Sequence, residues 1–564
     1  MQSSSPSSFG HRSAHAWGIV LLLAVACSDC KSGSSADAPA SADAGAEAAS
    51  TAQLGQPPTI DILTFQYDLS RTGVTSAETI LTPANVAAGS FGRRASWPVD
   101  GYVYAQPLYV SHLLTPSGER EVVFVATEHD SVYAFDAAGT SGDPLWHVSL
   151  LESDEVPVPS EDTLAPDISP EIGITGTPVI DRAAELLYVV SKAKRADGTY
   201  VQRLHALRLA DGTEKAGAPV VIAAQLRGTT DDAKDGLLSF EPLRHNQRAA
   251  LALIGGRVVI AWASHGDNEP YHGWLMAYDT ADLTRAPAAF VTTPDGLGGG
   301  IWMGASGPSA DDEGNIYVSS GNGVFDMEDD ESRTDYGLST LKLHLDGDTF
   351  TVKDFFSPHE TTELQAADLD YGTSAAIMLP DRSAAPLHRV VVAGKTGTLY
   401  VLDRENLGHY DTETDHVVQT LDVKSSFLIS NPIFFNDMLY VLPHHQPLMV
   451  FETDPATGLF EVNPSAVAAT CQTCFDRGST PCISADGTKN AIIWVLDNGG
   501  YQKSAPAILH AYDATDLSRE LYTSPVSALD ANAAGPAVKF TVPAVANGRV
   551  FVGGQKQVTV YGLR

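Results

Sequence analysis

The chain has 564 residues and is strongly acidic, with 69 Asp and Glu residues against 35 Lys and Arg residues and a formal net charge of −34. This balance argues against a nucleic-acid partner, because phosphate backbones are bound through clusters of basic side chains. Hydrophobic residues make up 43% of the sequence, which is enough to build a sizeable core. An acidic surface of this kind suits a soluble exported protein or a cation-binding site.

Residues 1–27 have the features of an export signal. A weakly basic start that includes Arg12 precedes a short apolar run at Trp17–Ala26, which is too short to span a bilayer as a stable anchor. The sequence LAVAC at residues 23–27 resembles a bacterial lipobox, and this resemblance implies a lipid anchor on Cys27. Cleavage by ordinary signal peptidase at the same small residues is the alternative. Both interpretations place the protein outside the cytoplasm, in the cell envelope or periplasm.

Residues 28–58 are rich in Ala, Ser, Gly and Asp and have no apolar period. Such a segment buries too little apolar surface to offset the entropy lost on ordering. We therefore expect a flexible tether, with the globular part of the protein beginning at residue 59 and touching the membrane only through the lipid anchor.

One strand pattern repeats eight times between residue 59 and residue 564. In six copies a proline precedes a short strand, a turn and a second strand, as in Ile301–Gly323, where Pro308 precedes the first strand and Ile316 begins the second. The third strand of several copies ends in an aspartate, such as Asp136. A period of roughly 60 residues with four short strands per copy is typical of a β-propeller. The sequence therefore predicts an all-β, eight-bladed β-propeller of four-stranded antiparallel blades.

The two ends of the repeated region are incomplete. Phe91–Val99 is a strand without partners in a copy of its own, and the last copy, Phe540–Gly562, has only three strands. We expect the N-terminal strand to join the C-terminal blade, because closing the ring removes its free sheet edges. Residues 65–86 have the composition of loops and turns.

Three cysteines lie close together near the C-terminus, Cys471, Cys474 and Cys482. Phe475 follows the CxxC motif where haem attachment requires His, and no fourth ligand for zinc lies nearby. In an exported chain we expect a disulfide among these three cysteines, with the pairing left open.

Candidate functional residues are expected in two sets of loops, those that enter each innermost strand and those that join the second and third strands. These loops gather around the axis on one face of a propeller. Their polar residues concentrate in the third to fifth copies, which favours a binding site there. The third copy includes His245, His265 and His272, which are candidate ligands for a transition metal or ordinary polar loop residues.

Four short motifs in these loops occur in a characteristic order. They are GIW, which ends at Trp302, SGNG around Asn322, LDYG around Asp370 and GKTGTLYVLDR around Lys395. In this order and near this spacing they resemble the quinoprotein alcohol dehydrogenase-like family, eight-bladed propellers that bind pyrroloquinoline quinone (PQQ). The resemblance extends from about residue 60 to the C-terminus.

The resemblance implies PQQ and calcium as cofactors. Trp302 would stack on the planar quinone, Lys395 would stabilise negative charge on the quinone oxygen, and Asp370 would act as the general base. Calcium prefers oxygen ligands. Those implied here are Asn322, Asp370 and one of Asp267 and Glu269, which lie in the loop before the GWLMAYD strand at 273–279.

Three functions stay open at this point. The first is a calcium-assisted, PQQ-dependent oxidoreductase that acts on a small-molecule alcohol or sugar. The second is a non-catalytic envelope lipoprotein that binds other proteins, as the related outer-membrane assembly scaffolds do. Two absences from the sequence favour it. There are no adjacent cysteines, which form a disulfide over the quinone in the family, and there is no haem motif. The third is a metal-dependent enzyme that uses the three histidines of the third copy.

Overall fold

The structure is a computed structural model that describes residues 59–326, 334–424, 428–469 and 479–564. The predicted signal at 1–27 with Cys27, the predicted tether at 28–58, and the CxxC motif lie outside the described residues. Residues 56–564 form one compact unit. In the part of the chain that is described, no helix has the length and apolar character needed to cross a membrane.

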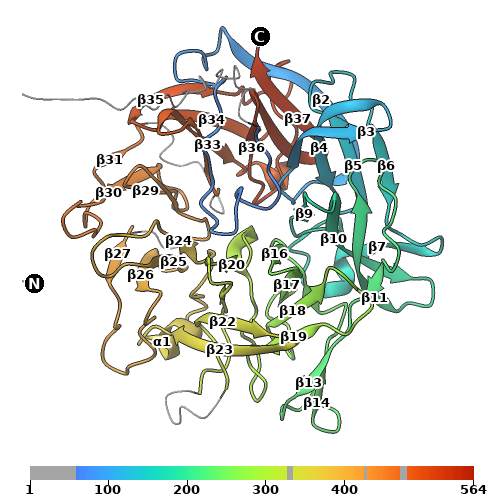
Figure 1. The fold of residues 1–564 in the computed structure, drawn as a ribbon, viewed down its shortest axis with the longest axis vertical. Helices are drawn as coiled ribbons and strands as arrows, with labels where there is room; N and C mark the ends of the chain where they lie inside the picture. The colour runs from blue at the N-terminus through green and yellow to red at the C-terminus, as the bar shows by residue number, and fades with distance from the viewer. Residues whose placement is uncertain (1–58, 327–333, 425–427, 470–478) are drawn as a thin grey trace, which may run out of the picture. The chain divides into compact units, whose positions relative to one another are not determined.

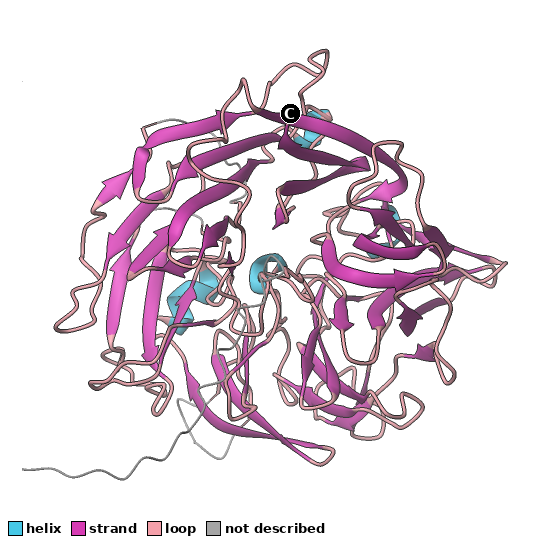
Figure 2. Cartoon of the chain, turned by 45° about the horizontal axis from the view of Figure 1, so that its top comes forward, coloured by secondary structure: helices cyan, strands magenta, loops and turns pink. Residues whose placement is uncertain are grey.

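Nine sheets are present among the described residues, and eight of them are the blades of a propeller. The ninth is a hairpin of β13 (Gln225–Arg227) and β14 (Leu237–Ser239). The blades follow one another around a ring in chain order (Figure 1), and Figure 2 shows their strands fanning outward from the centre. Neighbouring strands within each blade pair antiparallel, so the predicted all-β propeller of eight antiparallel blades is confirmed.

Blades 1 to 4 occupy the first half of the ring. Blade 1 contains β3 (Leu108–Thr115), β4 (Gly118–Ala126), β5 (Ser131–Asp136) and β6 (Trp146–Ser149). Blade 2 contains β7 (Glu155–Pro159), β8 (Glu171–Ile172), β9 (Val179–Asp181), β10 (Leu186–Arg195), β11 (Tyr200–Arg208) and β12 (Val220–Val221). Blade 3 contains β15 (His245–Asn246), β16 (Ala252–Ile254), β17 (Arg257–Ser264), β18 (Trp274–Asp279) and β19 (Ala288–Val291). Blade 4 contains β20 (Ser309–Ala310), β21 (Ile316–Ser319), β22 (Thr340–Asp346) and β23 (Thr349–Phe356).

Blades 5 to 8 complete the ring. Blade 5 contains β24 (Ile377–Met378), β25 (Arg389–Ala393), β26 (Thr398–Asp403) and β27 (Gln419–Asp422). Blade 6 contains β28 (Ile433–Phe435), β29 (Met438–Val441), β30 (Met449–Glu452) and β31 (Ala466–Val467). Blade 7 contains β32 (Cys482–Asp486), β33 (Lys489–Asp497), β34 (Ile508–Asp513) and β35 (Asp516–Thr523), and β1 (Val74–Thr75) pairs parallel with β32. Blade 8 contains β36 (Ala544–Ala546), β37 (Arg549–Leu563) and β2 (Phe91–Tyr102). The helices are short: α1 (Thr361–Ala366), η1 (Ser160–Thr163), η2 (Met303–Ala305) and η3 (Tyr501–Lys503).

The ring is closed by the N-terminal strand, as the sequence predicts. Strand β2 pairs antiparallel with the second part of β37, from Phe91 opposite Leu563 to Tyr102 opposite Gln555. The first part of β37 pairs with β36. Aromatic side chains of β2 also contact the neighbouring blades, since Phe91 lies 5.5 Å from the ring of Trp494 in blade 7. Blade 8 therefore contains both ends of the propeller and leaves no open seam.

The repeated prolines and aspartates act locally, at strand ends. Each aspartate that ends a third strand accepts the backbone N–H two residues later, as Asp136 does from Ala138 at 2.9 Å. Such turns suit a short polar side chain. The same bond forms at Asp279, Asp403 and Asp513.

Six innermost strands begin directly after a proline. At that position the missing backbone N–H removes no hydrogen bond from the ladder. These prolines are Pro107, Pro178, Pro308, Pro432, Pro481 and Pro543.

Residues 60–78, here called the axial segment, run along the innermost strands of the ring. Most of them fall in the region predicted as loop and turn, and apart from β1 they have little regular structure. They are nevertheless bonded to seven blades. These hydrogen bonds join Ile62 to Tyr109, Leu63 to Ile180, Thr64 to Leu251, Tyr67 to Val545, Leu69 to Ala310, Ser70 to Met378 and Gly73 to Ile483, at 2.7 to 3.2 Å.

Arg71 is the centre of the axial segment and is fully buried, with 0% of its surface exposed. Its guanidinium donates to the carbonyl oxygen of Pro308 from Nε at 3.1 Å and from Nη2 at 2.8 Å. Its Nη1 donates to Thr64 Oγ1 and to the Phe65 carbonyl, both at 2.8 Å. Burial lowers the pKa of Arg71 to about 10, so the side chain still carries its charge at neutral pH.

The disulfide expected among Cys471, Cys474 and Cys482 stays a prediction, because Cys471 and Cys474 lie outside the described residues. Cys482 is a buried free thiol whose Sγ lies 3.5 Å from the carbonyl oxygen of Pro543. It is the first residue of β32, an innermost strand, and packs in the hydrophobic core. Burial raises its pKa to about 12, which keeps the thiol protonated and unreactive.

Replacing Arg71 by methionine should lower the free energy of unfolding by about 3 kcal/mol or more, because the carbonyls of Pro308 and Phe65 would lose a charged donor in a buried site. Urea unfolding followed by tryptophan fluorescence measures this change. Arg285→Met is the matched control, since the Arg285 side chain is 50% exposed in its ion pair with Asp279 and should contribute less than about 1 kcal/mol. Equal effects of the two substitutions would contradict a central role for Arg71.

Candidate functional site

The structure brings four sequence-predicted residues together on consecutive loops of blades 4 and 5. Trp302 lies on the loop that enters β20, Asn322 follows β21, Asp370 lies on the loop that enters β24, and Lys395 follows β25. Lys395 Nζ is 2.7 Å from Asp370 Oδ2. The backbone N–H of Asn322 donates to Asp370 Oδ1 at 2.7 Å. We call these four residues the axial cluster.

Gly321 connects Trp302 to the rest of the axial cluster. A Cβ atom at this glycine would lie 2.7 Å from Asp370 Oδ1 and 2.7 Å from Trp302 Cδ1, closer than real Cβ contacts. The carboxylate and the indole therefore flank one glycine backbone, and only the absence of a side chain allows this approach. The SGNG motif contains Gly321. Its close contact with Asp370, which lies on a loop of blade 5, becomes visible only in the structure.

Asp368 adds a second carboxylate at the mouth of the axial cluster. Its Oδ1 accepts from Asn322 Nδ2 at 2.9 Å and lies 3.1 Å from Lys395 Nζ. Its side chain is 68% exposed, whereas those of Asp370 and Lys395 are 13% and 15% exposed. The lysine is thus held between an inner and an outer carboxylate.

Burial and charge act in opposite directions on the central ion pair. Burial raises the pKa of Asp370 above its usual value, and the nearby Lys395 and the Asn322 N–H only partly offset this. Burial also acts to lower the pKa of Lys395, but attraction to Asp370 and Asp368 outweighs it and raises that pKa. A carboxylate with a raised pKa is a better proton acceptor near neutral pH, and a lysine with a raised pKa keeps its charge.

Two buried polar atoms of the axial cluster have no hydrogen-bond partner among the described residues, Asn322 Oδ1 and Trp302 Nε1. An amide oxygen next to a buried carboxylate is the donor chemistry that calcium prefers. A half-buried indole beside a glycine provides a flat surface for a planar ring. The residues present therefore fit a planar quinone and an oxygen-bound cation.

The third calcium ligand implied by the resemblance is not brought to the axial cluster by a hydrogen bond among the described residues. Asp267 Oδ1 instead accepts from the Tyr271 hydroxyl at 2.9 Å, and the backbone N–H of Glu269 donates to the Asp267 carbonyl at 3.1 Å. The Tyr271 side chain feels the charges of both Asp267 and Asp370. Burial raises its pKa, and both Asp267 and Asp370 raise it further.

The histidines of the third blade lie around one pocket of about 370 Å³. His245 Nδ1 lies 2.9 Å from the Glu241 carbonyl, His265 Nε2 lies 2.7 Å from Lys192 Nζ, and His272 Nδ1 lies 2.8 Å from the Thr293 carbonyl.

All three histidine rings are buried, and one nitrogen of each is already engaged by the protein. Burial lowers the pKa of His245 to about 3 and that of His265 to about 4, which keeps both rings neutral. Among the described residues, no three His, Cys, Asp or Glu side chains are arranged to hold a metal ion. The geometry is that of a buried polar network.

A buried carboxylate in blade 1 is a separate feature of the same loops. Glu128 Oε2 accepts from the Gly173 N–H at 2.8 Å and from Thr175 Oγ1 at 3.1 Å, and only 1% of the residue is exposed. Burial raises its pKa to about 8 from an ordinary value of 4.5. Glu128 is therefore a proton-binding group of the folded state.

No protein-family model matches the chain, and no curated protein sequence matches it. Solved structures do match. The chain is similar to the quinohemoprotein alcohol dehydrogenase ADHIIG of Pseudomonas putida HK5 (TM-score 0.54, 14% identity, covering 89% of this chain and 80% of that one). It is also similar to the quinohemoprotein alcohol dehydrogenase of Comamonas testosteroni (TM-score 0.55, 15% identity, 89% and 80%).

A europium-containing methanol dehydrogenase matches in the same way, with a TM-score of 0.57, 12% identity and coverage of 89% of this chain and 98% of that one. The chain thus has the propeller fold of the quinoprotein dehydrogenases. At these identities the likeness is one of fold, and the roles of individual residues rest on the geometry above.

Replacing Glu128 by glutamine should make stability less dependent on pH. In the wild type the unfolded state ionises this carboxyl above its ordinary pKa of 4.5, while the folded state holds the proton up to about pH 8, so folding loses stability as pH rises through that window. Between pH 5 and pH 9 the variant should gain about 1 kcal/mol or more relative to the wild type. Thermal unfolding at several pH values measures this, with the exposed Glu119→Gln as control. Parallel pH profiles for Glu128→Gln and the wild type would contradict the raised pKa.

Proposed function

We propose that this protein is a calcium-assisted, PQQ-dependent oxidoreductase that acts on an alcohol or a sugar. The observation that carries the proposal is the axial cluster, in which one buried carboxylate contacts a lysine at 2.7 Å, an asparagine N–H at 2.7 Å and the glycine that borders Trp302. A propeller core does not require a buried ion pair, an orphaned amide oxygen and a half-buried indole at one point of its axial loops.

When bound, PQQ would supply the redox chemistry by accepting the two electrons that leave the alcohol carbon. Trp302 would bind the flat cofactor through its indole face. Asn322 Oδ1, which has no partner among the described residues, and Asp370 would hold the calcium ion.

The chain's own residues would move the proton and balance the charge. Asp370 Oδ2 would accept the proton of the substrate hydroxyl, and the raised pKa of this carboxyl brings it closer to the operating pH. Lys395 would keep its positive charge beside the site, since its pKa is also raised, and would stabilise negative charge on an oxygen placed there. Asp368 would orient Lys395 from the solvent side.

Export through the segment 1–27 and a lipid anchor at Cys27 complete the proposal, and they would place this chemistry in the bacterial cell envelope. The acidic surface suits a small neutral substrate better than nucleic acid. A scaffold that binds envelope proteins without catalysis is the competing function, and it predicts no cofactor binding at the axial cluster.

Calorimetric titration of the protein with PQQ should show micromolar, calcium-dependent binding. The double variant Asp370→Ala, Asn322→Ala should lose this binding, because both proposed calcium ligands are removed. Quenching of the protein's tryptophan fluorescence gives a second readout that does not depend on turnover. Asp381→Ala is the matched control, because Asp381 is a 58% exposed carboxylate paired with His388 and should leave the affinity unchanged. Absence of heat, or equal heat in the double variant, would contradict the proposal and favour the scaffold function.

Replacing Gly321 by alanine tests the spacing of the axial cluster. The added Cβ would clash with Asp370 Oδ1 and Trp302 Cδ1, so PQQ affinity should fall by about tenfold or more, equivalent to ~1.4 kcal/mol. Gly89→Ala is the control, because a Cβ at Gly89 meets no atom within 4 Å. Calorimetry and the thermal midpoint of both variants separate a local effect from unfolding. Undiminished affinity in Gly321→Ala would show that the cofactor does not contact this glycine.

A further inference from the structure

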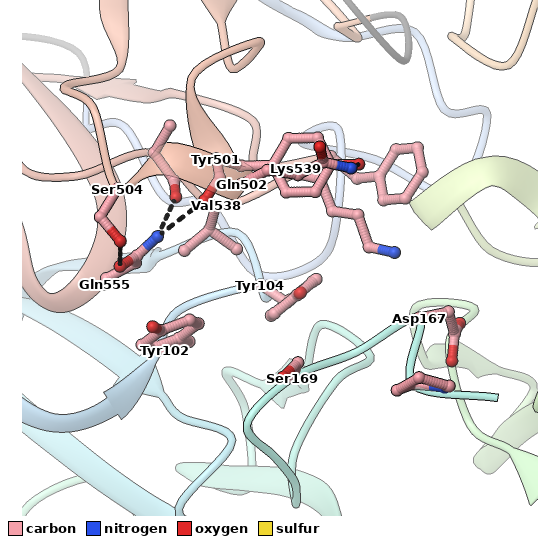
Figure 3. Close-up of a pocket in the computed structure, with 13 residues that line it drawn as sticks. Tyr102, Tyr104, Asp167, Ser169, Tyr501, Gln502, Ser504, Val538, Lys539 and Gln555 are labelled. Carbon is pink, nitrogen blue, oxygen red and sulfur yellow. Dashed lines mark hydrogen bonds between the residues drawn. The ribbon is translucent and has the colours of Figure 1, made fainter. Parts of the chain in front are cut away.

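A second cavity of about 560 Å³ opens among the axial loops of blades 7, 8, 1 and 2 (Figure 3). We call it the tyrosine cleft. It shares no lining residue with the axial cluster. It is lined by Tyr102, Tyr104, Pro166, Asp167, Ser169, Tyr501, Gln502, Ser504, Ala537, Val538, Lys539, Phe540 and Gln555.

The walls of the tyrosine cleft are aromatic. In Figure 3, Tyr501 lies on one side of the cavity, and Tyr102 and Tyr104 lie on the other. Phe540 adds a fourth ring and packs against the guanidinium of Arg248, whose Cζ is 3.9 Å from the ring centre. All four of these aromatic residues are partly exposed.

The cleft is fixed by hydrogen bonds that do not involve its aromatic faces. Gln555 Nε2 donates to the carbonyls of Ala537 at 2.9 Å and Tyr501 at 3.2 Å, and its Oε1 accepts from Ser504 at 2.9 Å (Figure 3). These bonds join residues of blades 7 and 8. A preformed cavity loses little conformational entropy when a ligand binds.

The cleft also contains hydroxyl and amide groups that can form further hydrogen bonds with a ligand. Within the described ranges, the hydroxyls of Tyr102 and Tyr104 form no hydrogen bond with the protein. Burial raises the pKa of Tyr104, so its hydroxyl stays protonated and can donate. Gln502 contributes an exposed amide, and its Nε2 already donates to the Tyr501 hydroxyl at 2.9 Å.

The charged side chains that line the cleft add up to no net charge. Its two charged side chains, Asp167 and Lys539, have opposite signs, and the chain around them carries a net charge of −34. Aromatic faces and hydroxyl or amide groups together suit a ligand with flat apolar faces and a hydroxylated rim. A neutral sugar ring has both features.

We propose that the tyrosine cleft binds a neutral carbohydrate, with one or two sugar rings held between Tyr501 and the pair Tyr102 and Tyr104. The volume lies within the range of ~300–1,000 Å³ that small-molecule sites occupy. This site is independent of cofactor chemistry at the axial cluster.

Calorimetric titration of the full-length protein with maltose, cellobiose and chitobiose tests the proposal. We expect saturable binding of at least one of these disaccharides. Tyr501→Ala should weaken it at least tenfold through loss of a stacking face, and Tyr104→Phe should weaken it severalfold through loss of one hydroxyl. Phe434→Ala is the matched aromatic control, since Phe434 lies in blade 6 and lines a different pocket. It should bind like the wild type.

Two further variants keep the outcome interpretable. Ser169→Arg places a long side chain at an exposed position of the cleft and should abolish binding even if Tyr501→Ala is unstable. Asp370→Ala should leave disaccharide binding unchanged, which separates this site from the axial cluster. The proposal is overturned if no disaccharide binds saturably, if Ser169→Arg binds like the wild type, or if Asp370→Ala alone removes the binding.

Discussion

The structure depends on how the backbone groups at the centre of the ring are satisfied. Innermost strands meet neighbours on one edge only, and buried carbonyls and N–H groups are costly when left unpaired. The axial segment supplies their partners from within the chain. Arg71 is the strongest case, because one guanidinium joins the carbonyl of Pro308 in blade 4 to Thr64 and Phe65 of the segment itself.

The axial segment also contacts the strand that follows the loop of Trp302. The loop that contains Trp302 enters β20 before Pro308, whereas Leu69 and Arg71 bond to Ala310 and Pro308 at the start of the same strand. The axial segment therefore fixes the start of the strand that the Trp302 loop enters. Loops held on a rigid base can place charged side chains accurately, which is the condition for a binding site.

The axial cluster contains a largely buried ion pair between Asp370 and Lys395. Asp370 and Lys395 are 13% and 15% exposed, and such a pair gains less from its attraction than it loses in hydration unless further bonds complete it. Here the Asn322 N–H and Asp368 supply those bonds. A buried pair of this kind contributes little to stability, so the needs of the fold alone do not account for it.

The sequence by itself determined the features that depend on local pattern. The period, the prolines before the innermost strands, the turn aspartates such as Asp136, and the unpaired strand at Phe91 predicted eight blades and their closure. The order of the motifs also predicted that Trp302, Asn322, Asp370 and Lys395 would lie in axial loops, because loop position follows from strand count.

Only the tertiary structure decided the rest. Arg71 sits in a segment without periodicity, and its partners are the Thr64 hydroxyl and backbone carbonyls, which any residue provides. The walls of the tyrosine cleft come from loops as distant as Tyr102 and Tyr501. Each of these features depends on contacts between segments hundreds of residues apart. Such contacts produce no regular spacing in the sequence, so no sequence pattern predicts them.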